Sequence, residues 1–355
     1  MPWLIWTFGV LFLFYKFFIQ NFVSLISNSL MQQFFIGAAG LGALSSAFYI
    51  AYSMMQIPIG VLMDRFGARF LLATAAALSG IGCLIFSMTN SYSVAIISRA
   101  FMGIGSSFGF IGMAYISSHW FSKKRLPLLL GLGNSLGMLG SVCAGGPFAQ
   151  LLNSIPWNHV ILLFGVFGIL IGIGIIVFLR KEKQSSTHNH EKVSLKHSMK
   201  VVACNKSIWL NGVIALLFYV TTTGFAGLWG VPFFQNVYGL DARIAGWAVS
   251  MLFFGWIVGG PIIGMMANTL HSRKKLQFVS ILITFLCMVI IIYFTHISTP
   301  ILFALMFAVG VFSSAELLSF ALSVEAVPFN VKGTSMAITN CIISFGSFAV
   351  QPLVG

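Results

Sequence analysis

The sequence has very few charged residues. Of its 355 residues only 7% are charged and only six are Asp or Glu, whereas 58% are hydrophobic and the mean hydropathy is +0.98. A soluble domain is nearer to about 25% charged and about 45–50% apolar. Because a water-soluble fold must cover itself with polar groups, this composition excludes one and indicates a chain that folds within a lipid bilayer.

The chain also lacks the residue patterns of enzymes and metal sites. Its five cysteines show no CxxC or other metal-ligand spacing, and four of them lie inside apolar runs, where a small packed residue is the simplest interpretation. The sequence contains no nucleophile–base set and no ATP-binding phosphate loop. We therefore expect no enzymatic activity, no cofactor and no metal.

Long apolar runs, in contrast, are abundant. Stretches near the ~20 residues that cross a ~30 Å hydrocarbon core occur eleven times, at 3–26, 38–62, 69–88, 92–117, 126–151, 158–179, 207–231, 244–267, 276–295, 299–324 and 333–355. The first run is too long for a cleaved signal peptide. Each run must be helical, because lipid offers no hydrogen-bond partner to an unpaired backbone amide. The predicted fold class is an all-α membrane protein.

Basic residues collect in alternate loops. Sixteen Lys and Arg residues lie in the loops near 64–69, 118–125, 180–206, 268–275 and 325–332, and Arg243 alone lies in the others. Loops rich in Lys and Arg face the cytoplasm. The net charge of +13 therefore reflects topology, and we expect a lipid bilayer but no nucleic acid as a partner.

One long polar segment divides the chain unequally. It separates six spans from five, which predicts a first helical bundle at 1–179, a cytoplasmic linker at 180–206 and a second bundle at 207–355. A shift near 205 residues relates the two parts. It pairs Gly60 and Asp64 with Gly264 and Asn268, and Asn134, Gly140 and Pro147 with Asn340, Gly346 and Pro352. Duplicated halves are typical of secondary transporters.

The segment GVLMDRFGAR resembles the signature that the major facilitator superfamily carries between its second and third helices. The matching residues are Gly60, Leu62, Asp64, Arg65, Gly67 and Arg69. Arg99 followed by Gly103 is similar to the family's fourth-helix motif. The resemblance covers the whole chain and implies two six-helix bundles related by a pseudo-two-fold repeat. Eleven spans are present, and we expect the twelfth to be missing from a truncated product.

The resemblance also implies a conformational switch, built from Gly60, Asp64, Arg65, Gly67 and Arg69. Asp64 would meet a helix N-terminus of the other bundle and pair with a neighbouring arginine, which is a contact that can form in one state and break in the other. The alternative, that the segment only places positive charge on the cytoplasmic side, would explain the arginines but not Asp64 or the two glycines. The family's fifth-helix antiporter motif is not matched, because Val142 precedes and Ala149 follows Gly146-Pro147.

Three charges fall within the apolar spans, where each is costly unless it faces a wet cavity or a partner: Lys16, Arg99 and Glu316. Lys16 shares a helix face with Gln20 and either contacts substrate or extends to the interface. Arg99 serves substrate contact or structural pairing. Gln20 is also expected to contact substrate. Glu316 is a candidate for substrate contact and for proton coupling, with an ion pair as the alternative. Trp229 is either a gate of the cavity or an interfacial anchor.

The sequence therefore predicts a secondary transporter that moves a small solute by alternating access. Two intramembrane cations against one carboxylate favour a substrate with an anionic group, such as an organic acid, an amino acid or a short peptide such as a dipeptide. The alternative is a non-transporting membrane sensor or a degenerate transporter remnant, as Asn268 and the absent twelfth span suggest. The expected location is the bacterial inner membrane, and the oligomeric state is left open.

Overall fold

The computed structural model describes residues 2–66, 68–122, 125–179, 201–269, 272–328 and 331–354. All the regular structure in these ranges is helical. Eleven of the described helices are long and apolar enough to cross a membrane: Pro2–Ser24, Ala38–Gln56, Ala68–Met88, Tyr92–Ser117, Leu128–Leu151, Trp157–Phe178, Lys206–Tyr238, Ala242–Ala267, Arg273–Tyr293, Thr299–Glu325 and Thr334–Leu353. The predicted all-α membrane fold and its eleven spans are confirmed.

We call the first six spans the first half and the remaining five the second half. The first half comprises α1 (Pro2–Asn21), η1 (Phe22–Ser24), α2 (Ser27–Phe34), α3 (Ala38–Phe66), α4 (Ala68–Met88), α5 (Tyr92–Ser106), α6 (Phe108–Trp120), α7 (Leu126–Cys143), α8 (Gly146–Leu151) and α9 (Trp157–Phe178). The boundaries at 179 and 206 stay a prediction, and residues 180–200 of the predicted linker lie outside the described ranges.

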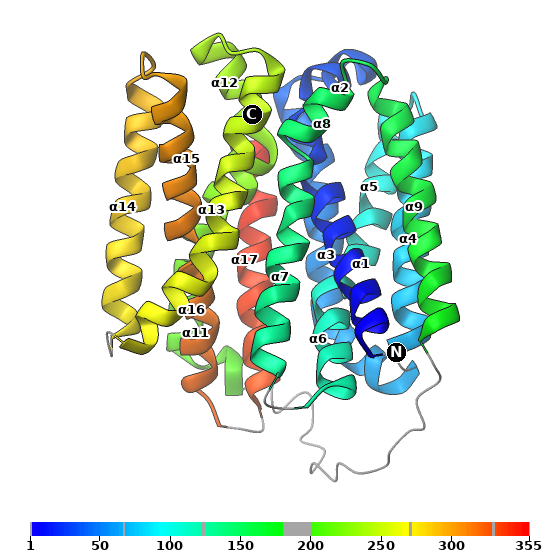
Figure 1. Cartoon of the computed structure of the whole chain (residues 1–355), viewed down its shortest axis with the longest axis vertical. Helices are drawn as coiled ribbons and strands as arrows, with labels where there is room; N and C mark the ends of the chain where they lie inside the picture. Colours follow the sequence, from blue (N-terminus) through cyan, green and yellow to red (C-terminus); the bar gives the residue numbers. More distant parts are fainter. Residues whose placement is uncertain are drawn as a thin grey trace.

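The second half comprises α11 (Lys206–Val220), η2 (Thr221–Trp229), α12 (Gly230–Tyr238), α13 (Ala242–Thr269), α14 (Arg273–Tyr293), α15 (Thr299–Ser313), α16 (Glu316–Glu325) and α17 (Lys332–Val354). The two halves stand side by side, and α3, α7, α13 and α17 run along the boundary between them (Figure 1). We call the end at which α1 begins the basic end, because the lysine- and arginine-rich connections lie there, and the opposite end the neutral end.

One connection is shorter than predicted. The sequence suggested a loop near 64–69, but α3 continues through Asp64 and Arg65 to Phe66, and α4 begins at Ala68. A helix can extend beyond the apolar layer because its backbone groups remain paired while its charged side chains meet water. The signature therefore lies mostly on the last turn of a helix. The side chains of Asp64 and Arg65, and the whole of Gly67, are outside the described part of the structure.

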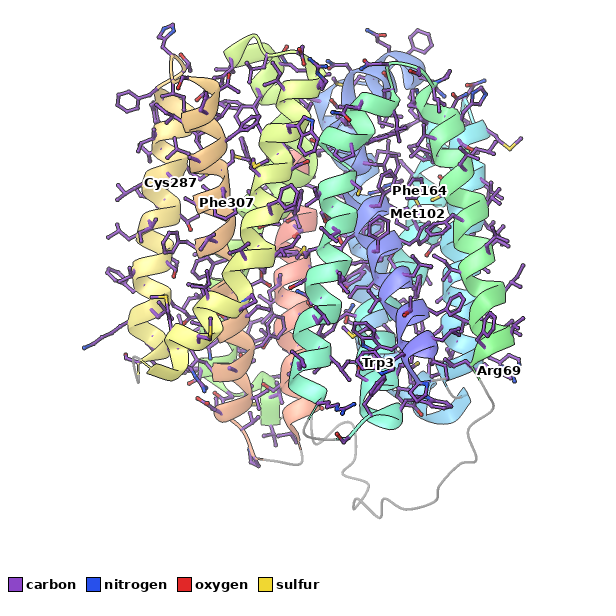
Figure 2. The ribbon with its side chains drawn as sticks, in the orientation of Figure 1. Trp3, Arg69, Met102, Phe164, Cys287 and Phe307 are labelled. Atoms are coloured by element: carbon purple, nitrogen blue, oxygen red, sulfur yellow. The ribbon has the colours of Figure 1, made fainter. Side chains whose placement is uncertain are left out.

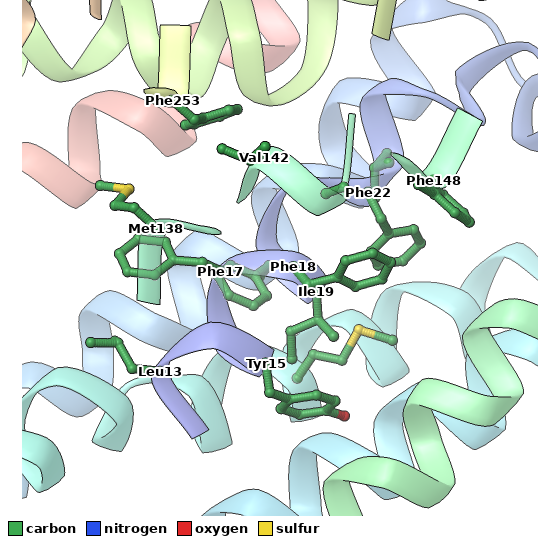
Figure 3. Close-up of a cluster of buried hydrophobic side chains, with 14 of the residues drawn as sticks. Leu13, Tyr15, Phe17, Phe18, Ile19, Phe22, Met138, Val142, Phe148 and Phe253 are labelled. Atoms are coloured by element: carbon green, nitrogen blue, oxygen red, sulfur yellow. The ribbon is translucent and has the colours of Figure 1, made fainter. Parts of the chain in front are cut away.

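Aromatic packing fixes α1 at the centre of the first half. The rings of Phe18 and Phe164 stack with their centroids 3.6 Å apart, and Phe148 meets Phe18 edge-on at 5.5 Å. Figure 3 shows Phe18 and Phe148 beside α1, with Met138 and Val142 of α7 on the side that faces Phe253 of α13. Stacked and edge-on rings stabilise a contact beyond the area that they bury, so these rings hold α1 within the first half.

The boundary itself is closed at the neutral end. The Ser250 hydroxyl of α13 donates to the Val142 carbonyl and accepts from the Gly146 amide, both at 2.9 Å. A Cβ added to Gly145 would lie 2.6 Å from the Gly246 carbonyl oxygen, so the two backbones touch. Glycine permits such an approach because it has no side chain to displace.

The same helix faces diverge toward the basic end. Gly131 lies eleven residues before Val142, three turns along the same face of α7, yet a Cβ at Gly131 would meet no atom within 4 Å. Gly264 lies five turns after Gly246 on α13 and is equally open. Leu128, one turn before Gly131, is 68% exposed. Helices α7 and α13 are therefore in contact at the neutral end and apart toward the basic end.

Candidate functional site

Two opposite charges face each other across the boundary between the halves. Lys16 of α1 is 5% exposed, and Glu316, the first residue of α16, is 4% exposed. Their charges interact electrostatically. They are not in direct contact, however, because the one ion pair formed within the described residues joins Arg273 to Glu325. The structure thus brings together two of the three intramembrane charges found in the sequence.

Both charges are incompletely neutralised. The Lys16 ammonium lies 3.9 Å from the centre of the Phe17 ring and 5.2 Å from that of Tyr52, where cation–π attraction holds it. Oxygen Oε2 of Glu316 is buried without a hydrogen-bond partner. A buried charge is costly until it is paired and hydrogen-bonded. A ligand that enters between the two halves could therefore pair with Lys16 or donate a hydrogen bond to Glu316.

Gln20 links the halves one turn beyond Lys16. Its amide nitrogen donates to the hydroxyl of Tyr49 on α3 at 3.2 Å and to that of Tyr219 on α11 at 3.3 Å. The sequence placed Gln20 on the face of Lys16 but gave the two tyrosines no role in the site. Tyrosine is common as a packed residue in apolar spans. Only the position of Tyr49 and Tyr219 beside Gln20 therefore shows that they belong to the site.

The last helix adds further polar groups to this boundary. Tyr52 interacts with Asn340 of α17 and with Gln56. Gln351 of the same helix donates from its amide nitrogen to the Thr223 carbonyl at 2.9 Å and also interacts with the Tyr49 hydroxyl. The sequence missed Gln351, although a Gln inside an apolar span is a signal that could have found it.

Trp229 lies beside this polar group, at the end of η2. It is partly buried, and its indole nitrogen donates to the Gln351 carbonyl at 3.0 Å. The hydrogen bond ties η2 to α17 within the second half. It gives Trp229 a structural contact and leaves its predicted part in gating the cavity untested.

Arg99 of α5 contacts α1 within the first half. It is fully buried on α5, and its guanidinium donates to the Ile19 carbonyl at 2.7 Å and lies 4.8 Å from the centre of the Phe48 ring. Its Nε and Nη2 have no hydrogen-bond partner. The contact with a main-chain carbonyl just before α1 ends at Asn21 matches the structural alternative more directly than contact with substrate. Substrate contact stays a prediction.

The structure describes only part of the predicted conformational switch. Gly60, Asp64 and Arg65 belong to α3 by their backbone. Arg69 of α4 donates from Nε to the Ile176 carbonyl of α9 at 2.9 Å, near the basic end of the first half (Figure 2). Arg69 therefore contacts its own half, and the predicted bridge from Asp64 to the other half stays a prediction.

No cluster of three or more His, Cys, Asp or Glu residues suited to a metal ion occurs within the described ranges. The site instead combines one ammonium, one carboxyl group, phenol hydroxyls and side-chain amides on helices of both halves. Such groups can bind and orient a polar solute.

Comparison with known proteins identifies the family of the chain. Residues 7–351 match the family described as Major Facilitator Superfamily. The chain is 23% identical over 281 residues to the probable L-galactonate transporter of Escherichia coli K12, covering 72% of this chain and 61% of that protein. It is 21% identical over 253 residues to the membrane sensor protein UhpC of Salmonella typhimurium, covering 66% of this chain and 57% of that protein. The chain thus spans about three fifths of the length of these curated relatives.

The fold agrees with a solved structure as well. A bacterial homologue of the human lysosomal transporter Spinster, in an inward-facing and occupied conformation, superposes with a TM-score of 0.77. The identity is 16%, and the match covers 98% of this chain and 80% of that one. Since the family match extends over nearly the whole sequence, the chain belongs to the Major Facilitator Superfamily.

Proposed function

We propose that this protein is a secondary transporter that moves a small solute with an anionic group across a bacterial inner membrane by alternating access. The observation that carries the proposal is the buried Lys16 ammonium, which faces the other half and has no described carboxylate in direct contact with it. Organic acids, amino acids and short peptides such as dipeptides all offer a carboxylate to such a group.

The geometry supports a cycle in which the halves rock about the bound solute. In the structure α7 and α13 touch at the neutral end, through Ser250 and Val142, and separate toward the basic end. If the basic end faces the cytoplasm, as its lysines and arginines indicate, this arrangement admits solute from inside. A solute that bridges Lys16 and Tyr219 would draw the halves together at the basic end and allow the neutral end to open.

Glu316 supplies a candidate for coupling to protons. An ionised Glu316 attracts Lys16 but repels an anionic solute that binds between them. Protonation removes that repulsion and leaves Lys16 free to hold the anion. An anion would then cross together with a proton, whereas a zwitterion would use both charges and need none.

A membrane sensor is the second candidate, because one relative carries that description. A sensor would bind the solute through the same groups without carrying it across. Binding with no uptake therefore separates the two functions.

Uptake into proteoliposomes tests the proposal. Purified protein would be given radiolabelled L-galactonate, a dipeptide or galactitol, a neutral polyol, with and without an inward proton gradient. We expect accumulation of at least one carboxylate compound above protein-free liposomes, and none of galactitol. Binding without accumulation would favour the sensor, and uptake restricted to galactitol would contradict the anionic substrate.

A further inference from the structure

A group of neutral polar side chains lies beyond Lys16, toward the neutral end of the boundary. It comprises Gln20 and Asn21 of α1, Tyr49 of α3 and Gln351 of α17, all between 0% and 4% exposed. Tyr219, which is partly exposed, forms its edge through Gln20. We call these residues the amide cluster. Each half contributes to it.

The amide cluster has hydrogen-bond acceptors without donors. The side-chain oxygens of Gln20, Asn21 and Gln351 are buried and unpartnered. Most buried polar side-chain atoms in proteins have a partner, because an unpaired one costs free energy. Three unpaired amide oxygens in one place therefore require an explanation.

For two of these residues the orientation of the amide is fixed. Asn21 donates to the Phe17 carbonyl at 3.1 Å and to the Ser141 hydroxyl at 2.8 Å, and Gln351 donates to the Thr223 carbonyl. A carbonyl only accepts, so turning either amide would set oxygen against oxygen. The unpartnered atom is thus an oxygen in both cases, and its missing partner must be a donor.

The backbone of η2 packs closely against this cluster at Gly227. A Cβ added to Gly227 would lie 2.9 Å from the Asn21 amide oxygen and 3.7 Å from the Tyr49 hydroxyl. Gly227 lies in η2, a π-helix of nine residues. Such helices are rare and are frequent at functional sites. A methyl group at this position would therefore collide with the Asn21 oxygen and lie against the Tyr49 hydroxyl.

We propose that the amide cluster binds hydroxyl groups of the substrate, so that the solute is a hydroxylated anion with its charge toward Lys16 and its hydroxyls toward Gly227. This inference deepens the proposed function and rests on it for the anionic group. A hydroxyl is a donor and an acceptor in one small group. It can therefore satisfy an amide oxygen and a phenol together, and a plain hydrocarbon chain would leave both unpaired.

Three six-carbon ligands separate the two parts of the site. L-galactonate carries a charge and hydroxyls, hexanoate carries the charge alone, and galactitol carries hydroxyls alone. Calorimetry on the purified full chain would measure the affinity of each. In the unaltered protein we expect L-galactonate to bind about 10- to 100-fold more tightly than hexanoate, since each hydrogen bond contributes about 0.5–1.5 kcal/mol and 1.4 kcal/mol is tenfold.

The variant Gly227→Ala places a methyl group between Asn21 and Tyr49. We expect it to weaken L-galactonate and galactitol about tenfold and to change hexanoate less than twofold. Gly224→Ala is the matched control, because its added Cβ would make ordinary contacts, at 3.5 Å from Val220 and Val350, in the same π-helix. Tyr49→Phe gives a second variant should Gly227→Ala fold poorly, with the same ligand pattern and about a fivefold loss.

Equal affinities for L-galactonate and hexanoate in the unaltered protein would overturn the hydroxyl subsite while leaving the anionic proposal standing. An equal loss of all three ligands in Gly227→Ala would overturn it too. If neither anion binds, the anionic proposal fails on its own. The affinity for galactitol then tests the hydroxyl subsite. If galactitol binds and Gly227→Ala weakens its binding, the subsite is supported; if galactitol does not bind, the subsite is overturned.

Discussion

The first span of each half changes its helical winding, but the two changes are opposite. In the first half α1 tightens into the 3₁₀ turn η1, whereas in the second half α11 widens into the π-helix η2. The repeat shift of about 205 residues takes Phe22–Ser24 into the range Thr221–Trp229. The two positions are therefore related by the internal repeat.

The side chains at these positions differ as much as the winding. The first helix carries Lys16, Gln20 and Asn21, which are long or polar, and the second presents Gly224 and Gly227. The first helix of the first half therefore carries polar groups of the proposed site, whereas η2 brings the side-chain-free Gly227 against them. Repeat symmetry therefore sets where a site lies without dividing its chemistry equally.

The largest expected effect comes from the charge of the first helix. Lys16→Gln should weaken L-galactonate about 100-fold and its neutral amide only a few-fold. A unit pair at 4 Å contributes ~4 kcal/mol at an effective dielectric near 20, and desolvation offsets part of this. Lys16→Arg, which keeps the charge, is the control. Binding calorimetry checks the result, and equal losses for both ligands would mean that Lys16 supports the fold.

The next effect concerns the closed end of the boundary. Gly145→Ala would place a methyl group 2.3 Å from the Ser250 hydroxyl oxygen, so the neutral end should open in part of the population. Overpacking costs about 1–3 kcal/mol, which shifts such an equilibrium roughly 5- to 150-fold. Labelling of a cysteine introduced at Gly246 by an impermeant reagent, compared with the same cysteine beside native Gly145, should show the opening. Gly131→Ala, in open space on α7, should leave labelling unchanged.

A third test makes the first half resemble the second at the signature. Asp64→Asn installs the amide that the second half already carries at Asn268. If Asp64 forms the predicted switch, expression should stay normal while the uptake rate falls about 5- to 10-fold, as expected for a bias of about 1–1.4 kcal/mol. Asn268→Asp is the reciprocal variant. Uptake and cavity accessibility that both match the unaltered protein would remove Asp64 from the switch.

The smallest effect concerns the end of η2. Trp229→Phe removes the hydrogen bond to the Gln351 carbonyl and keeps an aromatic ring. One such bond contributes about 0.5–1.5 kcal/mol, so we expect a fall of a few degrees at most in melting temperature. A gate role would show instead as a changed uptake rate at unchanged stability. Trp209→Phe is the comparison for melting temperature and uptake, because it also removes an indole hydrogen bond, to the Ala203 carbonyl, but on the exposed surface of α11.

Much of the fold was predictable because lipid constrains it so strongly. An apolar run of twenty residues has one stable form in a bilayer, so all eleven spans agree with the structure. The winding of η2 was not predictable, since an α-helix and a π-helix differ in backbone hydrogen bonds and the residues Thr221–Trp229 are compatible with either.

The candidate site was predictable where charge marks it. Lys16 and Glu316 stand out in apolar runs because isolated charges are rare there. Tyr49 and Tyr219 do not, since their hydroxyls matter only because Gln20 lies between them. For Arg99 the sequence left open both substrate contact and structural pairing. Its contact is a main-chain carbonyl, a group that every residue carries and that no sequence pattern can reveal.

The divergence of α7 and α13 also has a consequence for water. The faces that separate between Gly131 and Gly264 are open to solvent, so closing them expels that water and opening the neutral end admits more there. In the proposed transport cycle, each turn would therefore move a volume of water in and out of the protein. Polymers too large to enter the gap lower the water activity outside it and favour whichever state holds less water. The uptake rate should accordingly depend on the size of an added osmolyte as well as on its concentration.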